Sequence, residues 1–158
     1  MKTKLLALVL ALAAPVFAAG DHADGHAHGA VKKLSGPNQG RVITQIKPHA
    51  ELFVTAERKV RLTFLDDAGK PVAVPAGLSA TLVTGERSAP VTLAFAADGE
   101  GAAGSLLTTA ALPEGKNLPA VLRVKPAADA ETVTVRVPLN LATCGECSRP
   151  EYACACAH

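Results

Sequence analysis

The feature that most constrains the fold of this chain is a repeated alternation of polar and apolar residues. It is clearest in residues 58–65, where polar or charged side chains take every second position and Val60, Leu62 and Phe64 take the positions between them. Successive side chains of a β-strand point to opposite faces, so a period of two is typical of a strand with one buried face. We find no segment with convincing helical periodicity.

Segments of this kind recur at spacings near ten residues, and we count eight or nine of them. Short polar turns separate them, such as residues 66–71, where Gly69 is free to adopt a positive φ angle. This pattern predicts an all-β fold, an antiparallel β-sandwich of immunoglobulin-like or similar type, over residues 36–142. We expect a core of Val, Leu and Ala, with Phe53, Phe64 and Phe95 as its largest members. The predicted strands are 41–46, 49–55, 58–65, 72–74, 79–84, 90–95, 106–107, 119–125 and 131–137.

The beginning of the chain has the pattern of a secretory signal. Lys2 and Lys4 precede an apolar run of ten residues, Leu5–Ala14, and small residues follow. This run is about half the length that a membrane-spanning helix requires. We therefore expect residues 1–18 to be a signal peptide, cut after Ala18 or, less favourably, after Ala19. The mature protein is then periplasmic or secreted, with no membrane insertion after cleavage.

Cleavage also changes the charge balance. The chain of 158 residues has 16 Lys and Arg, and loss of Lys2 and Lys4 leaves 14, equal to its 14 Asp and Glu. A neutral protein lacks the basic surface that nucleic-acid binding requires, so we expect no nucleic-acid partner.

Residues 19–35 contain three histidines among Ala, Gly and Asp, with almost no bulky apolar side chain. Such a segment cannot bury enough surface to offset the entropy lost on ordering, so we expect a disordered arm. His22, His26 and His28 are candidate weak ligands for zinc, copper(II) or nickel. A soluble spacer explains the same composition equally well.

The four cysteines of the chain all lie in residues 143–158, in the order Cys144, Cys147, Cys154, Cys156, and His158 follows them. Two residues between the first pair allow one turn of backbone to direct both sulfurs to one ion, and Gly145 suits such a tight turn. The second pair can approach the same ion from the other side. Four thiolates, or three with the histidine, match a tetrahedral zinc ion or a soft copper(I) ion.

Two disulfides are the alternative, because an exported protein meets an oxidising compartment and four is an even number of cysteines. A bridge between Cys154 and Cys156 would be strained, so the pairings that fit join Cys144 and Cys147 to the later pair. A thioredoxin-like redox pair is disfavoured, because the chain has no βαβ pattern to carry it. The terminal histidine has no use in a disulfide staple, and it favours a metal-binding tail.

The remaining polar residues do not form a recognisable catalytic arrangement. There is no phosphate-binding glycine loop, no nucleophile elbow and no zinc-protease helix motif, so we expect a protein that is not an enzyme. His49 and Glu51 share one face of a predicted strand, and Pro48 beside them suggests the edge of a sheet. We interpret the two as a solvated pair at that edge.

Three short stretches carry a resemblance to a known kind of domain: Pro37-Asn38-Gln39-Gly40-Arg41, His49-Ala50-Glu51-Leu52 and Leu65-Asp66-Asp67-Ala68-Gly69-Lys70-Pro71-Val72. In this order they resemble a bacterial periplasmic β-domain that occurs alone or attached to heavy-metal efflux adaptor proteins, often after a His-rich segment. The resemblance implies a periplasmic location and a metal-related role. The expected function is to bind, buffer or hand over zinc or copper, with an efflux adaptor or another envelope protein as partner. The alternative is an envelope binding or structural module with a disulfide-stapled tail.

Overall fold

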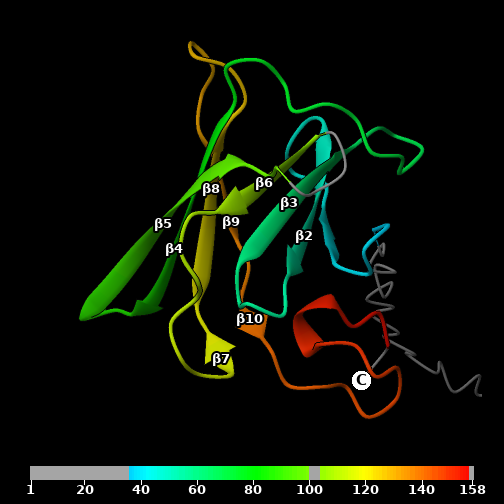
Figure 1. The fold of residues 1–158 in the computed structure, drawn as a ribbon, viewed down its shortest axis with the longest axis vertical. Coiled ribbons are helices and arrows are strands. Elements are labelled where there is room, and N and C mark those ends of the chain that lie inside the picture. Colours follow the sequence, from blue (N-terminus) through cyan, green and yellow to red (C-terminus); the bar gives the residue numbers. More distant parts are fainter. Residues whose placement is uncertain (1–35, 100–103, 157–158) are drawn as a thin grey trace, which may run out of the picture. The chain divides into compact units, whose positions relative to one another are not determined.

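The computed structural model describes residues 36–99 and 104–156, and over these residues it confirms the all-β, antiparallel prediction (Figure 1). Within that part of the chain, no helix has the length and apolar character needed to cross a membrane. The strands are β1 (Arg41–Ile43), β2 (His49–Val54), β3 (Val60–Leu65), β4 (Ser79–Glu86), β5 (Ala89–Ala97), β6 (Ser105–Thr108), β7 (Asn117–Leu118), β8 (Ala120–Lys125), β9 (Val133–Arg136) and β10 (Leu139–Asn140). A short 3-10 helix, η1 (Glu151–Ala153), follows them.

Eight of these strands form one curled antiparallel sheet in the order β1-β2-β3-β6-β5-β4-β8-β9. The long strand β5 belongs to both halves of this sheet, because residues 89–94 pair with β4 and residues 95–97 pair with β6. The two halves enclose the core between them (Figure 1). The short strands β7 and β10 pair separately with each other.

The alternation in the sequence explains which side chains form the core. In β8, for example, Ala120, Leu122 and Val124 are buried while Arg123 is exposed. Phe64 is fully buried as predicted, and Phe95 packs against the edge of the core. Phe53 was wrongly predicted to be a core residue, because the neighbouring Leu52 takes the inward position and Phe53 lies on the opposite face, only partly buried.

One predicted strand is absent from the structure, and two short strands are additional to the prediction. Residues 72–74 do not form a strand; the chain beside them makes an isolated bridge between Pro71 and Leu65, and the N–H of Val72 donates to the carbonyl of Phe64 (2.9 Å). The two-residue strands β7 and β10 were not predicted, since a pair of residues carries no periodicity. Prolines also interrupt the pattern beside them, at Pro119 and Pro138.

The proposed edge pair of His49 and Glu51 is also corrected. Strand β2 lies between β1 and β3, so it is not an edge, and Glu51 is 0% exposed. Its carboxylate accepts hydrogen bonds from the backbone N–H groups of Asn38 (2.9 Å) and Gly40 (2.6 Å) and from the Asn38 side chain (2.7 Å). A turn that precedes β1 therefore covers this carboxylate. A Cβ atom at position 40 would lie 2.3 Å from the carbonyl oxygen of Leu52, so this close approach requires glycine.

Candidate metal centre

The cysteine-rich segment continues directly from β10 and packs against the β-domain. It lies beside β10 and near Val54, the last residue of β2 (Figure 1). Two residues of η1, Tyr152 and Ala153, are each 3% exposed and belong to the same core cluster as the strands. The segment is thus positioned by the β-domain, although the sequence alone suggested a separate tail.

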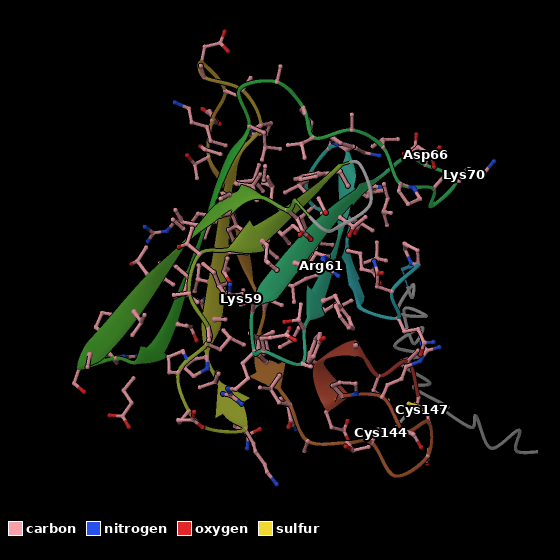
Figure 2. The ribbon with its side chains drawn as sticks, viewed as in Figure 1. Lys59, Arg61, Asp66, Lys70, Cys144 and Cys147 are labelled. Carbon is pink, nitrogen blue, oxygen red and sulfur yellow. The ribbon has the colours of Figure 1, made fainter. Side chains whose placement is uncertain are left out.

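The first two cysteines lie in a tight turn, labelled in Figure 2. The N–H of Cys144 donates to the carbonyl of Arg149 (2.8 Å), and the N–H of Ser148 donates back to the carbonyl of Cys144 (3.0 Å). Thr143 and Pro150 pair as an antiparallel bridge, so the chain reverses direction within this turn. The positive φ angle that closes the turn is at Ser148 (57°), and Gly145, which the sequence had suggested for this role, has no positive φ.

The second pair of cysteines follows η1. The N–H of Glu151 donates to the carbonyl of Ala142 (2.9 Å), which ties the start of the 3-10 helix to the strand end. The N–H of Cys154 then donates to the carbonyl of Glu151 (3.2 Å) and ends the helix. This arrangement brings Cys154 back over the first turn.

The fold brings all four predicted cysteine ligands together. Their sulfur atoms lie within 4.8 Å of one another. The Cys154 sulfur is 3.4 Å from that of Cys144 and 3.7 Å from that of Cys147. Four sulfurs placed about 2.3 Å from one zinc ion in a tetrahedron would be about 3.8 Å apart. The cluster therefore has the dimensions of a tetrathiolate metal site, and small side-chain movements would complete it.

Backbone amides and neighbouring sulfurs shift the acidity of these thiols. The N–H groups of Cys147 and Glu146 lower the pKa of Cys144 to about 7. At Cys154 the N–H of Cys156, 3.3 Å from the sulfur, acts in the same direction, but burial and the neighbouring thiols raise its pKa overall. The thiols of Cys154 and Cys147 raise the pKa of Cys156. When one of these crowded thiols has lost its proton, its negative charge opposes deprotonation of the others. A divalent cation bound between the sulfurs would stabilise the deprotonated thiolates.

All four cysteines are free thiols in the structure. The sulfur atoms of Cys144 and Cys154 are 3.4 Å apart, far longer than the roughly 2.05 Å of a disulfide bond. The same proximity that suits a metal ion would also allow these two residues to be joined after oxidation. The arrangement thus has two chemical outcomes, metal binding by thiolates and disulfide formation.

The other predicted ligands are not part of the described site. His158, His22, His26 and His28 lie outside the described residues. Within residues 36–99 and 104–156, the four cysteines form the one group of potential ligands with metal-binding proximity. His49 is elsewhere, with its Nε2 3.6 Å from the Asp67 carboxylate and 3.2 Å from the Lys47 amine.

Tyr152 is the functional residue that the sequence reasoning did not identify. It is the single tyrosine of the chain and it lies between the cysteines, which was the available signal. Its hydroxyl oxygen accepts a hydrogen bond from the backbone N–H of Val54 (2.9 Å), the last residue of β2. Burial raises the pKa of Tyr152, so the phenol stays neutral in this position. The contact joins residues 98 positions apart in sequence and fixes η1, and hence Cys154, on the β-domain.

Tyr152→Phe should destabilise the domain by about 1–2 kcal/mol, because the partly buried N–H of Val54 loses its acceptor while the ring still packs. Urea unfolding monitored by far-ultraviolet circular dichroism measures this difference. The matched control is Phe53→Leu on the outer face of β2, where a ring of similar size makes no contribution to the core cluster. Equal stability of Tyr152→Phe and the parent protein would show that this hydrogen bond makes no net contribution to the free energy of unfolding.

Comparisons with known proteins identified no relative of this chain. No protein-family model, no curated protein and no solved structure matches the chain significantly. The assignment of a candidate metal centre is therefore based on the chain itself, in which four cysteines cluster on an antiparallel β-domain.

Proposed function

We propose that this protein is an exported, non-catalytic metal-binding protein that binds one zinc ion through Cys144, Cys147, Cys154 and Cys156. The observation that carries the proposal is the convergence of four sulfurs within 4.8 Å of one another. Tetrahedral sites with four sulfur ligands are typical of zinc, and copper(I) is the other soft ion that thiolates select. The absence of methionine after residue 18 disfavours a copper carrier of the thioether type.

The role that we propose is to bind, buffer or hand over this ion in the periplasm. The signal-like residues 1–18 support export, and the resemblance to β-domains of heavy-metal efflux adaptors supports such a system as the partner. Thiolates hold zinc tightly, which suits buffering. The three histidines of residues 19–35 would add weak, rapidly exchanging ligands to the same protein.

Metal titration of the reduced protein tests the proposal. We expect uptake of one equivalent of zinc with release of protons, because thiols become thiolates when they bind. Fewer than four protons should be released at pH 7, since the Cys144 thiol, with its pKa lowered to about 7, is already partly ionised there. Affinity should fall steeply as the pH drops below 7, where protons compete for every sulfur. Calorimetry in two buffers of different ionisation enthalpy measures both quantities.

The same zinc titration of single-residue variants provides the control. Cys147→Ser should weaken zinc binding far more than Ser148→Ala, which removes an oxygen from the same turn but no ligand. A change of His158 to Ala should have a smaller effect than loss of any thiolate. The disulfide alternative predicts protein without free thiols whose reduction restores no stoichiometric zinc uptake, and that result would exclude the metal-binding function.

A further inference from the structure

The four cysteines are not equivalent in their access to solvent. Cys144 and Cys154 are each 1% exposed, whereas Cys147 and Cys156 are partly exposed. The sulfur atoms of these two buried residues lie 3.4 Å apart. The cluster therefore has a buried edge and an edge that faces solvent.

The buried edge is held by the fold. Cys144 is fixed through both its backbone groups, by Arg149 and by Ser148, at the base of the turn. Cys154 follows directly after Tyr152 and Ala153, which are packed in the core. Movement of the backbone of either residue away from an ion would require the turn or the core contact to open.

The two residues of the exposed edge differ from each other. Cys147 lies inside the closed turn, between the paired residues Cys144 and Ser148. Cys156 lies after η1, in residues 154–156, which have no regular secondary structure. Its N–H is directed to the Cys154 sulfur (3.3 Å), a contact that a small rotation of the chain can release. Cys156 thus combines solvent access with a position outside both the closed turn and η1.

We infer that Cys156 is the exchangeable ligand of the metal centre, and that an incoming thiolate replaces it when the ion is passed on. This inference rests on the proposed zinc site. In the step, the lone pair of the incoming thiolate forms a new zinc–sulfur bond while the bond to Cys156 breaks. The Cys156 thiolate leaves with its electron pair and then takes a proton from solvent. No electron is transferred, and the ion keeps three ligands from the protein until the acceptor supplies more. The partner is therefore a thiol-bearing acceptor.

Limited alkylation of the zinc-loaded protein tests this assignment without any mutation. A substoichiometric amount of iodoacetamide should modify the thiolate that leaves the ion most readily, forming a thioether with loss of iodide. Cleavage after Glu146 and Glu151 separates the peptides of Cys144, Cys147 and the later pair, and tandem mass spectrometry resolves Cys154 from Cys156. We expect modification of Cys156 at least tenfold above that of Cys144 and Cys154, and several-fold above that of Cys147.

Zinc transfer to a chromogenic chelator supplies a second measurement. Glutathione should accelerate transfer from the parent protein and from Ser148→Ala, which keeps all four thiolates, but it should have little effect on Cys156→Ser, where the exchangeable position is already open. Uniform alkylation, or preferential modification of Cys147 or of the buried pair, would overturn the inference while leaving zinc binding intact. Equal glutathione acceleration in all three proteins would overturn it as well. Failure of the reduced parent protein to take up zinc would instead remove the proposed function and this inference together.

Discussion

Removing zinc from the loaded protein should lower the melting temperature of the whole β-domain. The reason is that η1 shares its core: Tyr152 and Ala153 pack with the strands, and Val54 donates to the tyrosine hydroxyl. An ion that binds only the folded state at about 1,000 times its dissociation constant stabilises that state by about 4 kcal/mol. For a domain of this size we therefore expect a decrease of about 10–20 °C on removal.

Differential scanning calorimetry under reducing conditions, with and without a chelator, measures the shift. Backbone amide exchange of Leu122 in the centre of β8, which pairs with β4 and β9, shows whether the effect reaches that half of the sheet. Cys154→Ser is the matched control, since it should melt at the lower temperature with or without zinc. An unchanged transition of the parent protein after complete metal removal would show that the cysteine segment and the β-domain are energetically independent.

Glu51→Gln should destabilise the domain by about 3 kcal/mol. The buried carboxylate of Glu51 accepts three N–H groups from Asn38 and Gly40, and hydrogen bonds to a charged group contribute about 1.5–3 kcal/mol each. An amide in its place turns one acceptor oxygen into a donor that faces these N–H groups. The loss is smaller than the sum of the bonds, because the turn can separate from the sheet and bind water.

Equilibrium unfolding in urea measures this loss. Glu86→Gln is the matched control, because Glu86 is exposed at the end of β4 and the same change should cost less than 0.5 kcal/mol. Glu51→Asp should recover only part of the stability, since the shorter side chain reaches fewer donors. If Glu51→Gln and Glu86→Gln unfold at the same urea concentration, the buried carboxylate does not hold the turn.

Local pattern in the sequence was enough to predict most of the fold and the convergence of the four cysteines. The period of two in residues 119–125 survives folding, because β8 buries one face against the core. In β3 the predicted face is buried as well, but Thr63 and Leu65 on the opposite face are also buried. The spacing of the four cysteines likewise placed their sulfurs in one cluster, since a short turn and a six-residue loop leave the chain few ways to separate them. These features depend on residues near one another in sequence.

Tertiary structure decided the properties that depend on distant partners. Glu51 has the pattern of a solvated residue, and it is buried only because the turn at residues 37–40 folds over its face of the sheet. Tyr152 acquires its role from Val54, 98 positions away in sequence. The difference between Cys154 and Cys156 arises in the same way, because the core buries one sulfur and leaves the other partly exposed. Spacing determines which groups can meet, but burial and hydrogen bonding are set by the segments that pack around them.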